Sequence, residues 1–158
     1  MSAQPVGERR ITLAHWSFLQ WAVLVVGLVH IAWAIAGWIA EPSFAVGHHA
    51  PATPVLGMDY NGWHAVAGLA LFGPAPIAAI RKWWAAWYCV IAAVGGGFVV
   101  GIWALFSEQV LFFAFPNHIT DAIQHIVTGI VLLGLVGIQA ALDGGLRAVL
   151  TPTHPEAA

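Results

Sequence analysis

Four long apolar runs, separated by short polar segments, dominate the sequence. They cover about residues 16–40, 61–80, 85–106 and 122–142, and none of them contains Asp, Glu, Lys or Arg. A transmembrane helix needs ~20 apolar residues to cross ~30 Å of hydrocarbon. Strands of a membrane barrel are shorter and alternate in polarity, so these continuous runs favour helices. The pattern predicts an all-α integral membrane protein with a four-transmembrane-helix bundle.

The first run has an alternative interpretation as a cleaved signal peptide. Arg9 and Arg10 precede it, and Ala34-Ile35-Ala36 resembles a cleavage site. The apolar core of a signal peptide is usually ~7–15 residues long, whereas this run is longer and contains four Trp residues. We therefore expect a retained helix.

The composition supports a membrane protein and argues against some classes of partner and binding site. Of the 158 residues, 60% are hydrophobic and 8% are charged, and the mean hydropathy is +0.82. Soluble domains carry roughly 25% charged residues, so lipid must cover most of the surface. The net charge of −2 and the lack of a basic run do not indicate nucleic-acid binding. Cys89 is the only cysteine, which excludes an internal disulfide and a thiolate zinc site.

The basic residues predict the orientation. Arg9 and Arg10 precede the first run, Arg81 and Lys82 lie between the second and third, and Arg147 follows the fourth. All of them lie in the cytoplasm if both termini do. We therefore expect a plasma-membrane protein with a cytoplasmic segment 1–15, a transmembrane domain 16–142 and a disordered cytoplasmic tail 143–158. The loop 41–60 is expected to be only loosely ordered.

The second and fourth runs begin with similar sequences. Residues 61–68 read NGWHAVAG and residues 121–129 read DAIQHIVTG, so each run carries His-x-x-x-Gly near its outer end. This echo suggests two similar helical hairpins. Pro74 and Pro76 are expected to kink or end the second helix near its cytoplasmic exit.

Histidines gather toward the predicted outer side. His48, His49, His64, His118 and His125 lie in outer loops or at outer helix ends, and His30 lies near the middle of the first helix. The inner half has only isolated polar residues, which argues against a channel or an ion pump.

The His and carboxylate residues of the outer side have three interpretations. They form a structural clasp, a divalent-metal site or a haem b site, and no bound cofactor is the leading expectation. The metal site would use His64, His125, Asp121 and His118, and the haem site would use His64, His125 and His30. Asn61 is one helical turn from His64 and can orient it, while Gly68, Gly97, Gly101 and Gly129 permit the close approach of a helix or a porphyrin edge.

Three motifs together resemble a known family. They are Asn61-x-x-His64-x-x-x-Gly68, then Gly95-Gly96-Gly97 with Ile102-Trp103, and finally Asn117-x-x-x-Asp121-x-x-x-His125-x-x-x-Gly129. In this order, over residues 16–142, the chain resembles actinobacterial membrane proteins catalogued as domain of unknown function 4383. The resemblance implies a four-helix membrane fold and no activity, ligand or catalytic residue. The His48-His49 loop and the few basic residues depart from the family pattern.

The sequence contains no nucleophile–base pair, phosphate-binding glycine loop or zinc-protease motif. The leading hypothesis is therefore a non-catalytic accessory or envelope protein in the lipid bilayer, with other membrane subunits or further copies of itself as partners. The alternative is a metal- or haem-binding membrane protein that uses His64 and His125.

Overall fold

The chain forms four roughly parallel helical rods. The computed structural model describes residues 15–46, 50–106, 109–110, 113–114 and 119–152. The helices are α1 (Phe18–Ala40), α2 (Gly62–Phe72), α3 (Ala75–Ala78), α4 (Lys82–Ala92), the π-helix η2 (Ala93–Val99), α5 (Val100–Ala104), α6 (Ile119–Asp143) and α7 (Leu146–Leu150). The short strands are β1 (Thr53–Val55), β2 (Met58–Tyr60), β3 (Gln109–Val110) and β4 (Phe113–Ala114).

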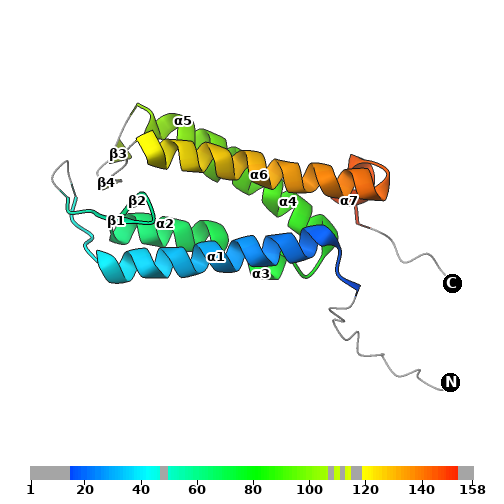
Figure 1. Cartoon of the computed structure of the whole chain (residues 1–158), viewed down its shortest axis with the longest axis horizontal. Coiled ribbons are helices and arrows are strands. Elements are labelled where there is room, and N and C mark those ends of the chain that lie inside the picture. Colours follow the sequence, from blue (N-terminus) through cyan, green and yellow to red (C-terminus); the bar gives the residue numbers. More distant parts are fainter. Residues whose placement is uncertain (1–14, 47–49, 107–108, 111–112, 115–118, 153–158) are drawn as a thin grey trace, which may run out of the picture.

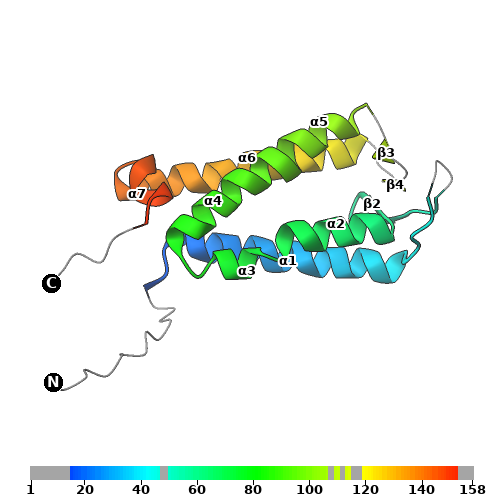
Figure 2. The same cartoon turned by 180° about the vertical axis from the view of Figure 1, so that it is seen from behind.

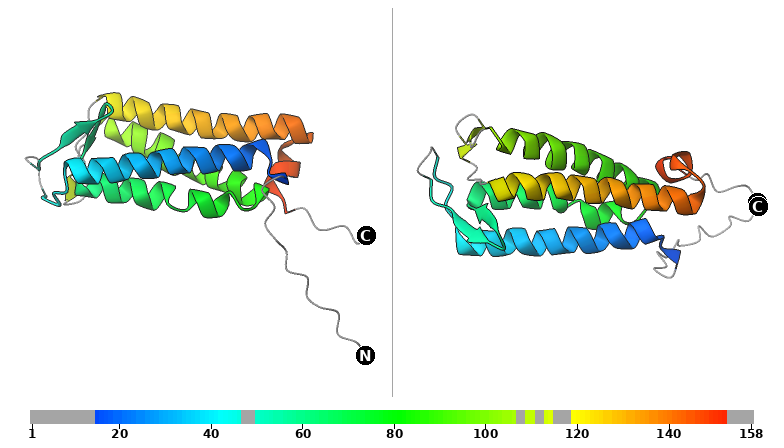
Figure 3. Two further views of the ribbon diagram at one scale, coloured as in Figure 1. Left: turned by 60° about the horizontal axis from the view of Figure 1, so that its bottom comes forward. Right: turned by 45° about the horizontal axis from the view of Figure 1, so that its top comes forward.

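The rods form two pairs (Figures 1 and 2). One pair is α1 with α2 and α3, and the other is α6 with the continuous α4–η2–α5 rod. The strands lie at one end of the bundle, which we call the hairpin end, and the described chain ends lie at the other, which we call the terminal end (Figure 3). The two pairs pack together toward the terminal end and diverge toward the hairpin end.

Three helical rods are long and apolar enough to cross a membrane. They are Phe18–Ala40, Lys82–Ala104 and Ile119–Asp143. The chain is therefore an all-α, multi-pass membrane protein. Capping fixes the start of the first, because the Ser17 hydroxyl accepts the Gln20 N–H and the Gln20 side chain accepts the Ser17 N–H.

The second apolar run is not the single helix expected over residues 61–80. It divides into α2 and α3, and each piece is too short to span a bilayer alone. The break lies at Gly73 and Pro74, because proline has no N–H to continue the helical hydrogen bonds. The two pieces still run beside α1 from the hairpin end to the terminal end.

The third apolar run also departs from a regular α-helix. The rod begins three residues earlier than expected, at Lys82, and it is a π-helix over Ala93–Val99. This segment contains Gly95, Gly96 and Gly97, whose low α-helix propensity weakens the regular pattern. The π-helix matters for the site described below.

The main core lies toward the terminal end and is built largely from alanine. Ala75, Ala79, Ala85, Ala86 and Ala93 are fully buried. Small side chains let helix backbones approach closely, which is how helices associate in a membrane. This half of the molecule is therefore densely packed.

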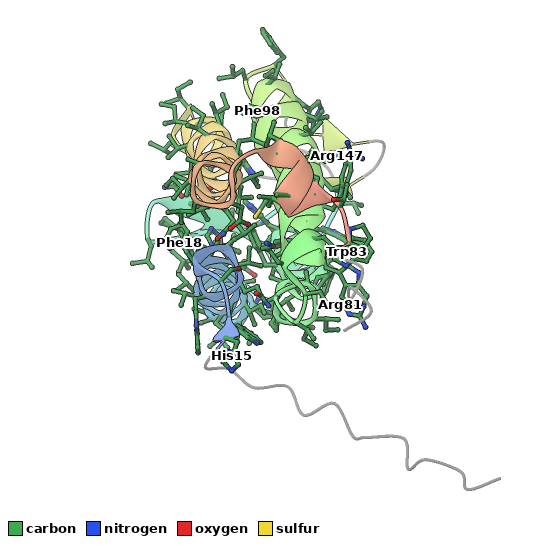
Figure 4. The ribbon with its side chains drawn as sticks, turned by 90° about the vertical axis from the view of Figure 1, so that its right-hand side faces the viewer. His15, Phe18, Arg81, Trp83, Phe98 and Arg147 are labelled. Atoms are coloured by element: carbon green, nitrogen blue, oxygen red, sulfur yellow. The ribbon has the colours of Figure 1, made fainter. Side chains whose placement is uncertain are left out.

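Polar groups at the terminal end connect the helix ends to one another. The Gln139 Oε1 atom accepts the buried Leu19 N–H at 3.0 Å, and the Gln20 Nε2 atom donates to the Ala79 carbonyl at 2.9 Å. Lys82 forms a 2.7 Å salt bridge with Asp143. Figure 4 looks onto this end, where His15, Arg81 and Arg147 are labelled.

The expectation of a disordered tail from residue 143 is wrong for residues 146–150. Gly144 and Gly145 have φ angles of 82° and 144°, and these left-handed conformations turn the chain back into α7. Val149 is fully buried in the main core, and the Leu150 carbonyl accepts the Trp87 Nε1–H at 3.0 Å. Burial of an apolar residue thus orders this part of the tail.

The described residues of the 41–60 loop, 41–46 and 50–60, are more ordered than expected. β1 and β2 form a hairpin whose two-residue turn, Leu56 and Gly57, has φ angles of 52° and 86°. Positive φ at both turn positions matches the twist of paired strands and favours glycine at Gly57. The Trp33 Nε1–H donates to the Val55 carbonyl at 2.9 Å, which holds the β1–β2 hairpin against α1.

Candidate functional site

A cavity of about 410 Å³ lies between the two helix pairs at the hairpin end. Its walls are mostly apolar side chains of α1, α2, η2, α5 and α6, and Met58 and Tyr60 of β2 contribute as well. Three histidines, His30, His64 and His125, line it from three different helices. We call this space the histidine cavity.

The start of α2 positions His64. The Asn61 side chain caps the helix by accepting the His64 N–H at 2.9 Å, and both residues are buried. The His64 Nδ1 atom hydrogen-bonds to the Asp59 carbonyl. The imidazole stacks on the Tyr60 ring, with 4.7 Å between the ring centroids. Backbone and ring contacts together fix the direction of this side chain.

The π-helix positions His125. The Val100 N–H donates to the Gly95 and Gly97 carbonyls and so bypasses the Gly96 carbonyl. The His125 Nδ1–H donates to this Gly96 oxygen at 2.8 Å and thereby connects α6 to η2. The irregular helix therefore supplies the acceptor that orients the imidazole, in line with the frequent occurrence of π-bulges at functional sites.

A backbone carbonyl also orients the His30 side chain, in this case one within α1. Its Nδ1–H donates to the Val26 carbonyl, one turn earlier, at 2.8 Å. Its ring stacks on Phe72, with a centroid distance of 4.0 Å and an interplanar angle of 22°. The intramembrane histidine thus has a partner on its own helix and an aromatic neighbour on α2.

The hydrogen bonds assign one tautomer to all three histidines. A backbone carbonyl only accepts, so each Nδ1 must carry the proton. The Nε2 atom of each neutral ring then has a free lone pair. Among the described residues, none provides a hydrogen bond to any of these three Nε2 atoms. Each of the three imidazoles that line the histidine cavity thus has an Nε2 lone pair, which can accept a hydrogen bond or bind a metal.

His64 and His125 face each other across the two helix pairs. Their ring centroids are 6.2 Å apart and their planes differ by 14°. The sequence echo placed a histidine near the outer end of each helix, and the fold brings these two side chains to the same cavity.

Asp121 and Gln124 add oxygen acceptors to the same wall. Asp121 is 1% exposed, and its Oδ1 atom accepts the Asp59 N–H at 3.1 Å, which connects α6 to β2. Gln124 Oε1 is buried and has no hydrogen-bond partner among the described residues. Burial and the nearby Asp121 raise the pKa of Tyr60 to about 12, so its hydroxyl stays protonated at neutral pH.

The glycines named from the sequence lie at helix contacts. A Cβ atom on Gly97 would lie 2.6 Å from the Gly129 Cα, and one on Gly101 would lie 3.1 Å from the Ala122 carbonyl oxygen. A Cβ on Gly68 would lie 3.2 Å from the Ala34 Cβ. At all of these positions the nearest atoms belong to a neighbouring helix, which makes glycine suited to close helix packing.

The remaining residues predicted for a metal site either lie outside the described residues or do not form a metal-binding group. His118, named as a metal ligand, and the His48-His49 pair lie outside the described residues. Within the described part of the chain, no group of three or more His, Cys, Asp or Glu side chains is arranged to hold a metal ion. His64, His125 and Asp121 line one cavity but do not form such a group.

Several cavity residues were not anticipated from the sequence. They are Trp33, Tyr60, Phe72, Gly96 and Gln124. One signal was available for Gln124, because it precedes His125 in a mostly apolar helix. The roles of Gly96 and Tyr60 depend on the π-helix and on the strand pairing, which the hydrophobic pattern does not reveal.

Comparison with known proteins assigns the family. The model of the family described as "Domain of unknown function (DUF4383)" matches residues 20–138. The match covers most of the chain, which therefore belongs to this family. No curated protein and no solved structure matches the chain.

Proposed function

We propose that this member of the DUF4383 family is a membrane-embedded protein that binds a small molecule in the histidine cavity, on the outer side of the plasma membrane. The observation that carries the proposal is the set of three Nε2 lone pairs, on His30, His64 and His125, in one mostly apolar cavity. Sites for small molecules and cofactors combine apolar walls with a few convergent polar groups, and their volumes are ~300–1,000 Å³.

The proposal includes the structural clasp that the sequence favoured. The Nδ1 side of His125 joins α6 to η2, and the Asp121 carboxylate joins α6 to β2. The Nε2 sides of the rings are left for a ligand. We therefore infer a non-catalytic binding role, as an accessory or envelope protein, rather than a purely structural one.

We also propose that the chain crosses the membrane four times, with both termini in the cytoplasm. Arg81 and Arg147 lie at the terminal end, and Lys82 lies there too, paired with Asp143 at the end of α6. All three are away from the histidine cavity, which supports the cytoplasmic assignment of this end. The fourth crossing would be made by α2 and α3 together. Irregular backbone such as their junction is tolerated at membrane depth where other helices cover it.

Extraction of the purified protein tests the binding role. The full-length protein is purified in mild detergent and denatured with organic solvent, and the released compounds are identified and quantified by mass spectrometry. We expect one compound at about one molecule per chain. The His64→Ala/His125→Ala variant should lose it, whereas Thr151→Ala, a change at the terminal end, should retain it.

Two results would contradict the binding role. One is a wild-type protein that releases nothing above detergent and bulk lipid, and that gains no thermal stability from a membrane extract. The other is a compound that the double variant retains at the same stoichiometry, because that compound would then bind without the two imidazoles.

A further inference from the structure

The facing imidazoles indicate a chemical class for the ligand. Resting on the binding role proposed above, we propose that the histidine cavity binds haem b, with the Nε2 atoms of His64 and His125 as the two axial ligands of the iron.

The spacing fits one metal between two imidazoles. An imidazole nitrogen binds a transition metal at about 2.0 Å and lies about 1.1 Å from its own ring centroid, so two rings on opposite sides of one metal have centroids about 6.2 Å apart. The centroids of His64 and His125 are 6.2 Å apart, with ring planes only 14° from parallel. The rings of His30 and Phe72 are also close to parallel, but their centroids are much closer, at 4.0 Å, so the distance distinguishes the two pairs.

The orientation of the nitrogens fits axial ligation. Metal-ligating histidines usually donate the other ring N–H to a backbone carbonyl or carboxylate, which fixes the tautomer and increases the basicity of the ligating nitrogen. The Asp59 carbonyl does this for His64, and the Gly96 carbonyl does it for His125. The two carbonyls belong to different helix pairs, so each imidazole is held independently.

The number of protein ligands favours haem over a bare metal ion. A porphyrin supplies four equatorial nitrogens, so the protein needs to provide only two ligands. A zinc ion takes at least three protein ligands, and the described residues contain no such group. The cavity lies between the two helix pairs and has mostly apolar walls, as a macrocycle requires. No Lys or Arg is among the described residues that line it, so the two propionate groups would extend out of the cavity.

Titration with haemin tests the proposal directly. The purified full-length protein, in detergent, is titrated with haemin and followed by absorption and electron paramagnetic resonance spectroscopy. We expect one haem per chain and the low-spin spectrum of bis-imidazole iron. His64→Ala and His125→Ala should each abolish this spectrum. The control is His15→Ala, which removes an exposed imidazole at the terminal end and should leave the low-spin spectrum unchanged.

A substitution that preserves ligation protects the test against misfolding. His125→Met offers a thioether in place of the imidazole, so the haem should remain bound with a changed spectrum and a higher reduction potential. A spectrum unaffected by His125→Met would overturn the proposal, as would haemin binding that persists in the His64→Ala/His125→Ala variant.

Failure of the haem proposal is distinguishable from failure of the binding role. If haemin does not bind and extraction yields a metal-free compound that depends on His64 and His125, haem is excluded and the binding role stands. If neither haemin nor any extracted compound depends on these two histidines, both proposals are wrong.

Discussion

At the scale of single residues, the two ring nitrogens of each cavity histidine have different roles. The Nδ1 atom is used by a backbone carbonyl, and the position of that carbonyl determines where the Nε2 atom points. For His64 the carbonyl belongs to Asp59, and its place relative to α2 depends on Asn61, which starts the helix. A residue that touches no ligand can therefore control the site.

Asn61→Ala is expected to lower both stability and ligand binding. Loss of the cap leaves the His64 N–H unpaired in a buried position and should lower the free energy of unfolding by ~1–2 kcal/mol. The control is Ser17→Ala, which removes the cap of α1 at the terminal end. Both variants should unfold at lower denaturant concentration, but only Asn61→Ala should weaken haemin binding. Equal binding in the two variants would show that the α2 cap does not position His64.

The sequence identified some of these residues because they are chemically unusual in their surroundings. His64 and His125 are ionisable groups within apolar runs, and such residues carry a functional expectation. The same criterion could not identify Gly96, whose contribution is a backbone carbonyl. It also missed Tyr60, because its position against His64 depends on the pairing of β1 and β2.

At the scale of elements, the π-helix η2 has two functions. Its altered hydrogen bonding leaves the Gly96 carbonyl for His125, and its glycines let α6 approach the same segment. Gly97 faces the Gly129 backbone, whereas a Cβ on Gly95, two residues earlier, would meet no atom within 4 Å. The two glycines therefore have the same local backbone and different surroundings.

Substitution of these two glycines separates packing from backbone conformation. In Gly97→Ala, the new methyl group would lie 2.6 Å from the Gly129 Cα, so η2 and α6 must move apart. We expect a loss of ~1–3 kcal/mol in the free energy of unfolding, typical of overpacking, together with weaker haemin binding. Gly95→Ala should change stability by less than ~1 kcal/mol, in the stabilising direction, because alanine favours a helix. Denaturant unfolding measures both, and equal losses would show that the conformation of the segment, not the contact with α6, requires glycine.

Hydrophobic periodicity predicted the elements where length and polarity were sufficient. α1 and α6 follow long apolar runs closely, and Pro74 indicated the break after α2. α7 was missed because a five-residue helix, ordered by burial of Val149, has no periodicity to detect. The β1–β2 hairpin was missed because Leu56 occupies a positive-φ position that does not favour leucine.

At the scale of the whole molecule, the two halves of the bundle have opposite properties. The half at the terminal end is filled by alanine and small residues, and its polar groups pair with one another. The half at the hairpin end contains the histidine cavity, spanned by the β1–β2 hairpin. The dense half can hold the two helix pairs together while the other half keeps them apart, so a ligand can lie between them without disturbing the core.

Because the two ends of the bundle differ, the orientation of the protein in the membrane determines on which side the histidine cavity lies. Cysteine labelling measures this orientation. The single native cysteine, Cys89, is buried and is replaced by alanine. Exposed positions then receive one cysteine each: Ala52→Cys at the hairpin end, and Ile80→Cys or Thr151→Cys at the terminal end. A membrane-impermeant maleimide should label Ala52→Cys in intact cells, and the other two only after the membrane is permeabilised.

The Ile80→Cys result carries the most information about the fold. If α2 and α3 do not cross the membrane, residue 80 stays on the same side as residue 52, and both are labelled in intact cells. If the whole molecule is inverted, positions 80 and 151 are labelled in intact cells and position 52 is not. Only protection of both terminal-end positions agrees with four crossings, in which a broken helix completes the bundle and the histidine cavity faces outward.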